Sequence, residues 1–216
     1  MNWEKLYNGT EKIYDCLRLN SAVILGTLLG LGIFGLAPSL QAAHHVAKSI
    51  HQQKGINFYS SFFTYYRKHF IPSNKIFLSI TLLYGLPMLA VQQLFLPHFG
   101  TGALLVFLVS QGAMLATLNT LFAMYEFYEL PIRSYFPSAL KFLTYNPFGC
   151  LLALLWLGIC STVSYLLPGL LPFLSIGVWV YGNMGLYLKY FEDNEDKVKG
   201  AQLNNDTEMV RETTQN

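Results

Sequence analysis

The stretch Leu19-Asn-Ser-Ala-Val-Ile-Leu-Gly-Thr-Leu-Leu-Gly-Leu-Gly-Ile-Phe-Gly-Leu36 decides how this chain is organised. It carries no charge, and about 18 residues rising ~1.5 Å each nearly cross a hydrocarbon core of about 30 Å. We therefore predict a membrane-spanning helix over residues 19–37. Pro38 follows, and we expect it to end this helix, because proline lacks a backbone N–H and disfavours helical dihedral angles at the residue before it.

The composition places the chain among membrane proteins. Of its 216 residues, 53% are hydrophobic and only 12% are charged, whereas soluble domains average about 25% charged residues. Two long runs, between Ile76 and Met124 and between Phe142 and Leu188, contain no charge, and each is long enough for two crossings. We predict an all-α polytopic helix bundle with interfacial helices, forming one transmembrane domain over residues 1–190. Its five spans would cover residues 19–37, 76–96, 102–124, 148–167 and 170–190.

The distribution of basic residues predicts the topology. With five spans, the segments 38–75, 125–147 and 189–216 share one side and hold most of the 14 Lys and Arg residues. The positive-inside rule then places the C-terminus in the cytoplasm and the N-terminus outside a bacterial plasma membrane. The N-terminal segment carries equal numbers of acids and bases, so it fits either side. If the first apolar stretch were re-entrant, the N-terminus would be cytoplasmic instead.

Glycines punctuate the first apolar stretch. Gly30-Leu-Gly32-Ile-Phe-Gly35 matches the dinucleotide-binding fingerprint, but it lacks the preceding strand and the downstream acid that this site requires. A Gly-x-x-x-Gly pair precedes it at Gly26 and Gly30, and such pairs let neighbouring helices approach closely. We interpret Gly26, Gly30 and Gly35, together with Pro38, as helix-packing residues.

The segment that follows, residues 39–75, is basic and aromatic and contains no acid. An apolar stripe (Leu40, Ala43, Ala47 and Ile50) and a polar stripe (His44, Lys48 and His51) predict an amphipathic helix near the cytoplasmic surface. His44 and His51 are two helical turns apart, about 10 Å, which is too far to share one ion. We therefore predict no metal site.

Seven aromatic residues lie between Asn57 and Phe70, with Arg67-Lys68 near the end. One interpretation is burial in the membrane interface or against the spans. The other is a docking face for a cytoplasmic partner, since aromatic residues and Arg are enriched in interfaces. That face would comprise Lys48, Phe58, Tyr59, Phe62, Tyr66, Arg67 and Lys68. Nucleic acid is not expected on a surface so close to the bilayer.

Signs of catalysis or ion transport are missing. We find no serine or cysteine beside a plausible base, no phosphate-binding loop and no carboxylate in the middle of a predicted span. We expect no enzymatic activity and no cofactor. Glu126 and Glu129 should pair with Arg133 or with the basic segment. The tail, residues 191–216, is acidic and poor in apolar residues, so its composition predicts disorder.

A family resemblance rests on Asn20, Thr27-Leu28-Leu29-Gly30, Phe34-Gly35, Pro38 and Ala42-Ala43. Their order resembles the YesL-like family of small bacterial membrane proteins of unknown function, in which a Trp usually stands three residues after the Asn; Val23 is found here. The aromatic-Arg-Lys-x-Phe ending of residues 63–70 continues the resemblance. It implies a polytopic plasma-membrane protein of a kind often encoded beside carbohydrate uptake systems, and it carries over no functional residues.

Our first hypothesis is a non-enzymatic accessory or regulatory membrane protein associated with carbohydrate uptake or sensing, where the carbohydrate link rests on the resemblance alone. Its partners would be the lipid bilayer and a sugar uptake or sensor complex, or a second copy of the chain. The alternative is a transporter or permease subunit in its own right. Gln41-Ala42-Ala43 faintly resembles the coupling loop of binding-protein-dependent permeases, but it lacks that loop's acid and glycine.

Overall fold

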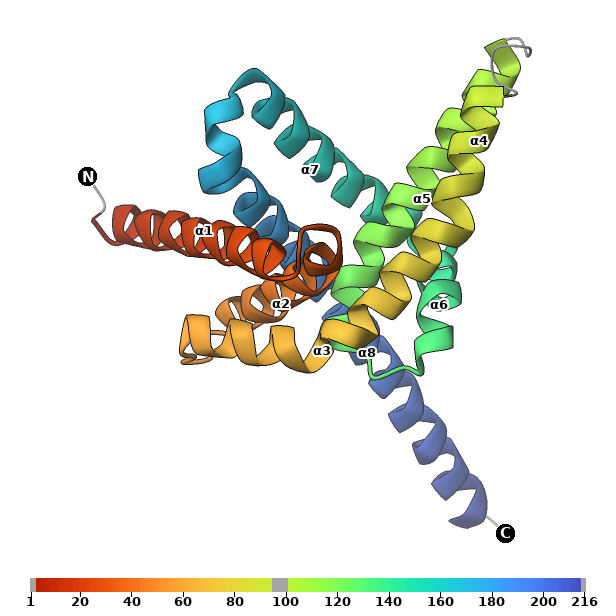
Figure 1. Cartoon of the computed structure of the whole chain (residues 1–216). Coiled ribbons are helices and arrows are strands. Elements are labelled where there is room, and N and C mark those ends of the chain that lie inside the picture. Colours follow the sequence, from red (N-terminus) through yellow and green to blue (C-terminus); the bar gives the residue numbers. More distant parts are fainter. Residues whose placement is uncertain (1–2, 95–100, 215–216) are drawn as a thin grey trace.

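The computed structural model describes residues 3–94 and 101–214, and all regular elements within these ranges are helices (Figure 1). The first half contains α1 (Trp3–Leu29), α2 (Ile33–His51), α3 (Phe58–Ile80), the π-helical turn η1 (Thr81–Gly85) and α4 (Leu86–Leu94). The second half contains α5 (Thr101–Phe127), α6 (Ile132–Tyr145), α7 (Pro147–Leu166), the short helices η3 (Pro168–Leu170) and η4 (Leu171–Ser175), and α8 (Ile176–Thr214). The prediction of an all-α bundle is confirmed.

The first apolar stretch forms a helical hairpin. α1 and α2 are joined by residues 30–32, where Leu31 and Gly32 have φ angles of 58° and 78°. The N–H of Gly32 donates to the carbonyl of Thr27 over 2.8 Å, which is the long hydrogen bond of a Schellman motif. The prediction of a single helix over 19–37 is wrong, because two successive residues in the left-handed region reverse the backbone in the middle of the stretch.

Pro38 does not end a helix, contrary to the sequence prediction. It lies buried inside α2, where its ring leaves the carbonyl of Phe34 without the usual N–H donor. The side-chain amide of Asn74, from α3, donates to that carbonyl over 2.8 Å. The proline is tolerated because a neighbouring helix supplies the missing hydrogen bond.

The two arms of the hairpin are in backbone contact at glycines. A Cβ atom added to Gly30 would overlap the Cα of Gly35, and one added to Gly35 would lie 2.5 Å from the carbonyl oxygen of Thr27. A Cβ added to Gly26 would lie 2.5 Å from the hydroxyl of Ser39. These three glycines therefore line the interface between α1 and α2, where no larger residue fits without a shift.

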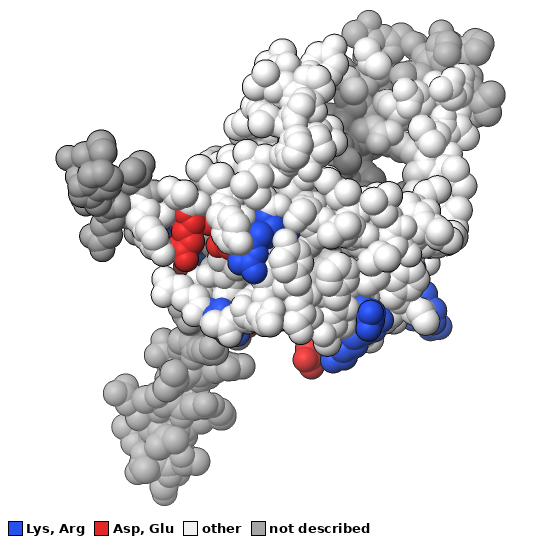
Figure 2. All heavy atoms as spheres, turned by 60° about the vertical axis from the view of Figure 1, so that its left-hand side comes forward, with Lys and Arg blue, Asp and Glu red and all other residues white. Residues whose placement is uncertain are grey.

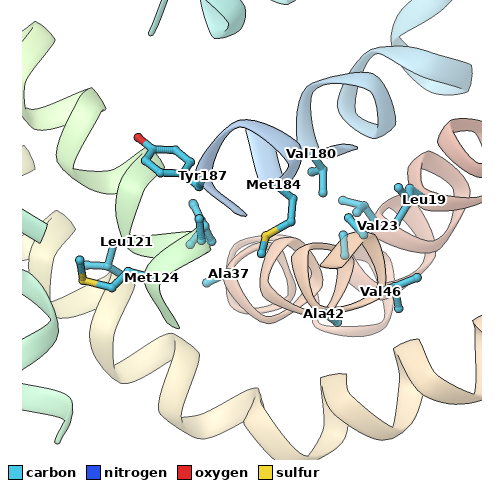
Figure 3. Close-up of a cluster of buried hydrophobic side chains, with 14 of the residues drawn as sticks. Leu19, Val23, Ala37, Ala42, Val46, Leu121, Met124, Val180, Met184 and Tyr187 are labelled. Atoms are coloured by element: carbon cyan, nitrogen blue, oxygen red, sulfur yellow. The ribbon is translucent and has the colours of Figure 1, made fainter. Parts of the chain in front are cut away.

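α2 lies at the centre of the molecule and contacts α1, α3, α5 and α8. Figure 3 shows side chains of α1, α2, α5 and α8 that meet in the core, among them Val23, Ala42, Leu121 and Met184. Most of α2 is buried, including Gln41 and His44. The predicted amphipathic helix is present, but the expectation that its polar stripe is exposed is wrong for His44, which faces other helices.

Asn20, fully buried in α1, ties the start of α8 to the hairpin. Its Oδ1 accepts from the backbone N–H groups of Ile176 (2.9 Å) and Gly177 (3.2 Å), and its Nδ2 donates to the carbonyl of Pro172 (2.6 Å). A Cβ on Gly177 would overlap the carbonyl oxygen of Cys16, so α1 and α8 are in backbone contact at this point. The side-chain amide of Asn20 therefore forms hydrogen bonds with the backbone where the π-helical η4 passes into α8.

Three of the described helical segments are long and apolar enough to cross a membrane: Leu104–Phe127, Pro147–Leu166 and Pro168–Glu195. They correspond to the last three of the five predicted spans. The second predicted span, 76–96, is divided among α3, η1 and α4, and its last two residues lie outside the described ranges. These three helical elements follow one another without a break, so the difference from the prediction is a local π-helical turn, which a hydropathy count does not detect.

α8 continues to Thr214, through the tail for which composition predicts disorder. Figure 1 shows this last part of α8, in blue, extending away from the other helices. The sequence offers a local reason, since Asp193 and Glu195 precede Lys197 and Lys199 by four positions, an order that favours a helix. The expectation of disorder rested on composition alone, and it stays a prediction for this tail.

Candidate functional site

A polar cleft of about 620 Å³ opens where α2, α3 and the C-terminal end of α5 meet. Titratable side chains line it, among them His45, Lys48, Tyr65, His69, Tyr125 and Glu126. They come from the consecutive helices α2 and α3 and from α5, which lies much further along the chain. We take this cleft as the candidate functional site.

Glu126, in the last turn of α5, is the hub of the site. Only 2% of its side chain is exposed. One carboxylate oxygen accepts from Gln41 Nε2 (2.5 Å) and from the Tyr65 hydroxyl (2.6 Å), while the other lies 2.9 Å from His45 Nδ1. Burying a carboxylate is costly unless it is hydrogen-bonded or paired. Donors from α2 and α3 meet this requirement and so connect both helices to α5.

Three rings form a column beside the carboxylate. His45 stacks on Tyr65, and Tyr65 stacks on His69, with ring centroids 4.0 Å apart in both pairs. Burial raises the pKa of the Tyr65 hydroxyl, and the nearby Glu126 carboxylate raises it further. Tyr65 is thus a neutral donor at physiological pH. Burial lowers the pKa of His69, although Glu126 opposes this shift.

Lys48 forms a hydrogen bond with the backbone at the C-terminal end of α5. Its ammonium donates to the backbone carbonyl of Glu126 over 2.5 Å and lies 5.0 Å from the ring centre of Phe127. The last carbonyls of a helix have no partner within the helix, so a lysine is a suitable donor to them. Burial lowers the pKa of Lys48, and the charge of Glu126 opposes this shift.

His44 lies next to this network and is fully buried. Its Nδ1 lies 2.8 Å from the carbonyl of Leu40, which can only accept, so Nδ1 carries the proton; Nε2 then accepts from Asn183 Nδ2 over 3.1 Å. Phe122 stacks on the imidazole ring, with centroids 5.3 Å apart. Burial lowers the pKa of His44 to about 4, so the ring is neutral at physiological pH. It connects α2 to α8.

The predicted docking face is divided by the structure. Phe58, Phe62 and Tyr66 follow one another at helical spacing on α3 and lie in the core, where the Tyr66 hydroxyl donates to the carbonyl of Gly26 over 2.9 Å. A docking role for these three aromatics is therefore wrong, and burial against neighbouring helices, the other interpretation, applies to them. Of the remaining residues, Tyr59, Arg67 and Lys68 are exposed, whereas Lys48 is half-buried.

The four histidines of residues 39–75 have separate partners. His44 bonds to Leu40 and Asn183, His45 to Glu126 and His69 to Tyr125, while His51 Nε2 lies 2.9 Å from the carbonyl of Tyr181. Across the described residues, no three His, Cys, Asp or Glu side chains gather closely enough to form a metal cluster.

Sequence reasoning found part of this site. The predicted pairing of Glu126 with the basic segment is correct for His45, whereas Lys48 donates to the backbone carbonyl of Glu126 and not to its carboxylate. Among the ion pairs of the described residues, none joins Glu126 to Arg133. Sequence reasoning missed Gln41 and Tyr65 as donors to Glu126. One available signal was that Glu126 is the first charged residue after the long charge-free run that begins at Ile76.

Comparisons with known proteins place the chain in a family. Residues 17–91 match the family described as "Protein of unknown function, DUF624". The chain is also 33% identical over 201 residues to the uncharacterized protein YesV of Bacillus subtilis (strain 168), a match that covers 87% of this chain and 89% of that protein. No solved structure matches the chain. The residues matched by the family include the turn of the α1–α2 hairpin, α3 and the part of the cleft that α2 and α3 form. The chain belongs to the DUF624 family.

Proposed function

We propose that the protein is a non-enzymatic integral membrane protein of the bacterial plasma membrane, with multiple spans, that acts as an accessory or regulatory component beside an uptake or sensing complex. The observation that carries this proposal is the separation of charge within the fold. The three long apolar segments are nearly free of charge until their ends, whereas charged residues gather around the cleft, in the N-terminal part of α1 and in the middle and second half of α3. This is the distribution expected of a bundle inserted in a bilayer.

Figure 2 supports this assignment. On the face drawn there, Lys, Arg, Asp and Glu side chains lie in the lower and middle part, and the described residues of the upper part are drawn in white, without charge. Figure 1 shows that the α4–α5 pair and α7 extend toward the same upper side. Many side chains there are both apolar and exposed, such as Val106 (72%) and Val109 (72%) on α5. Lipid would cover them, because soluble proteins rarely expose apolar patches of this extent.

The non-enzymatic part of the proposal rests on the arrangement around Glu126. A general base needs a free lone pair directed at a substrate. Here both carboxylate oxygens already accept hydrogen bonds from protein donors, and little of the side chain is exposed. The cluster therefore suits a structural role, holding α2 and α3 against the end of α5.

The exposed basic residues near the cleft are the proposed docking surface. Lys54 and Lys68 line its mouth, Arg67 is exposed beside Lys68 on α3, and Tyr59 is 43% exposed. Cations and an exposed tyrosine suit an acidic surface on a protein partner. The resemblance to YesL-like proteins adds the expectation that this partner belongs to carbohydrate uptake or sensing.

In-cell photo-crosslinking tests the proposal. We would place a photo-crosslinking amino acid at Tyr59, Arg67 or Lys68 of the full chain, expose living cells to light, and identify the captured proteins by mass spectrometry. Recovery of an uptake ATPase, a permease or a sensor kinase is the expected result.

A matched control uses the same crosslinker at Tyr165, which is 85% exposed near the end of α7, remote from the cleft. Equal capture of the same protein from both positions would contradict a specific docking surface. Recovery of lipid or of the chain itself alone would contradict the accessory role and direct attention to the alternative, a transporter with a solute path between its helices.

A further inference from the structure

The ends of the α1–α2 hairpin lie together. Glu11, Lys12 and Asp15 of α1 line a cleft of about 740 Å³ together with Gln53 and Lys54 from the segment between α2 and α3. The guanidinium of Arg18 also lies 4.1 Å from the ring centre of Phe58. The charged N-terminal part of α1 is thus held against the segment that follows α2.

The turn of the hairpin has the opposite character. Its side chains are aliphatic or aromatic, and several are largely exposed: Leu28 (68%), Leu29 (69%), Leu31 (87%), Ile33 (74%) and Phe34 (54%). No Asp, Glu, Lys or Arg occurs between Arg18 and Lys48. An exposed apolar patch of this kind marks a surface that water does not cover in the working protein.

We propose that the α1–α2 hairpin contacts lipid acyl chains through residues 28–34 and does not cross the membrane, so that residues 11–18 and 52–57 face the same aqueous compartment. This inference rests on the proposed membrane location and adds the topology of the N-terminal part. It adopts the alternative in which the first apolar stretch is re-entrant and the N-terminus is cytoplasmic. The hairpin geometry places residues 11–18 and 52–57 on the same side, because α1 and α2 run in opposite directions and these charged segments line one cleft.

The charge distribution agrees with this topology. If the hairpin does not cross, three crossings are the long apolar segments of α5, α7 and the first part of α8. We count a fourth over residues 76–94, where α3, η1 and α4 form one continuous helix without a charged residue. Four crossings return the chain to the side on which it began. All 14 Lys and Arg residues then lie on one side of the membrane, whereas five crossings leave the basic residues before Leu19 on the other side. The positive-inside rule favours the arrangement with one basic side, which is the cytoplasm.

Lipid suits the turn better than a protein partner does. A stable protein interface combines an apolar centre with a polar rim that forms hydrogen bonds. The exposed side chains of residues 28–34 carry no charge and no hydrogen-bonding group. Such side chains can contact lipid acyl chains, which form no hydrogen bonds, without leaving a polar group unpaired.

Cysteine accessibility tests the topology. In the Cys160→Ala background, which keeps the buried Cys16 and Cys150, single variants Lys12→Cys, Lys54→Cys and Gly169→Cys would be labelled with a membrane-impermeant maleimide in intact cells. Gly169 serves as the reference, since it is exposed between α7 and α8 and a Cβ there meets nothing within 4 Å. We expect positions 12 and 54 to be protected until the cells are permeabilised, and position 169 to be labelled at once.

Opposite labelling of positions 12 and 54 in membrane-integrated protein would overturn the hairpin topology and leave the proposed function intact. Recovery of the protein in the soluble fraction would overturn the proposed function itself. The two failures are therefore distinguishable in one experiment, because fractionation precedes labelling.

A fluorescent probe tests the lipid contact. The variant Leu31→Cys, labelled with the environment-sensitive dye NBD and reconstituted in phosphatidylcholine vesicles, should show blue-shifted emission that nitroxide-labelled lipids quench several-fold. The same dye at Lys54→Cys is the matched control and should report water. Water-like emission at position 31, or blue-shifted emission that the labelled lipids do not quench, would contradict lipid contact; the second result would indicate a protein partner or a second copy of the chain.

Discussion

Glu126 and His44 illustrate how single buried polar residues connect the helices of this protein. Each side chain bonds to groups from other helices: Glu126 accepts from α2 and α3, and His44 accepts from α8. Neither could be buried alone, since an unpaired polar group in the interior costs about 1–3 kcal/mol or more. Their partners therefore specify which helices meet and in what register.

Replacing Glu126 with Gln should destabilise the fold by about 1–3 kcal/mol, because an amide supplies one acceptor oxygen and turns an N–H₂ group toward existing donors. Thermal unfolding in detergent, followed by circular dichroism, measures the effect. Glu129→Gln is the control, because Glu129 is exposed one turn further on. Equal midpoints for the two variants would show that the cluster contributes nothing to stability.

The pKa of His44 gives stability a defined pH dependence. Burial lowers it to about 4 in the folded protein, whereas an unfolded histidine titrates near 6.5. Between these values the unfolded chain binds the proton more readily, so the contribution of His44 to stability is complete above pH 6.5 and is lost as the pH falls toward 4.

Unfolding free energies at pH 7 and pH 4 test this for the wild type and for His44→Gln. We expect the wild type to lose roughly 3 kcal/mol more than the variant over this interval. Comparison with the variant removes the effect of carboxylates that titrate in the same range. Parallel pH profiles would show that His44 is not buried in the neutral form.

At the scale of elements, α1 holds two others in place. Its glycines allow α2 to approach, and its Asn20 bonds to the backbone at the beginning of α8. Both interactions involve main-chain atoms of the partner helix, so they depend on close approach more than on the partner's side chains.

Asn20→Leu should destabilise the protein by about 2–4 kcal/mol, because the buried N–H groups of Ile176 and Gly177 would lose their acceptor. Asn57→Ala is the control; Asn57 precedes α3, is exposed and makes no side-chain cap hydrogen bond. Chemical unfolding in detergent distinguishes the two variants. A wild-type midpoint for Asn20→Leu would mean that water or a rearranged backbone replaces the amide.

Gly35→Ala should lower stability by about 1–3 kcal/mol, since the added methyl group meets backbone atoms of α1 that cannot rotate away. Gly158→Ala, on α7, adds the same methyl group where nothing lies within 4 Å. That control should be neutral or stabilise the helix by about 0.5–1 kcal/mol. The yield of folded protein and its thermal midpoint report both. A Gly35→Ala variant as stable as Gly158→Ala would argue against close packing of α1 and α2.

For the whole molecule, Phe191 is the last core residue among those whose burial the structure describes, and it packs on Phe127 and Tyr187. The rest of α8 extends away from the bundle (Figure 1). Removing residues 197–216 should therefore leave the thermal midpoint within about 1 °C, because every core residue whose burial the structure describes precedes this segment. Ending the chain after Gly185 instead removes Tyr187 and Phe191 and should prevent accumulation of folded protein. A large loss of stability in the shorter deletion would reveal a docking site for the tail.

Three features follow from the order of the residues alone: the fold class, the three long apolar helices and the basic character of residues 39–75. Hydropathy, the length of charge-free runs and local charge are properties of consecutive residues, so they can be read without knowing the fold. The positions of α5, α7 and the start of α8 were predicted correctly for this reason.

The place where the chain reverses and the pairing of the buried polar groups depend instead on how the helices pack. Pro38 stays helical because Asn74, which lies 40 residues beyond Phe34, supplies a donor to the Phe34 carbonyl. Phe58, Phe62 and Tyr66 are core residues because α1 and α2 cover their side of α3, and Glu126 is a hub because two remote helices bring donors to it. Each outcome depends on contacts between distant parts of the chain, and these form only when the helices pack.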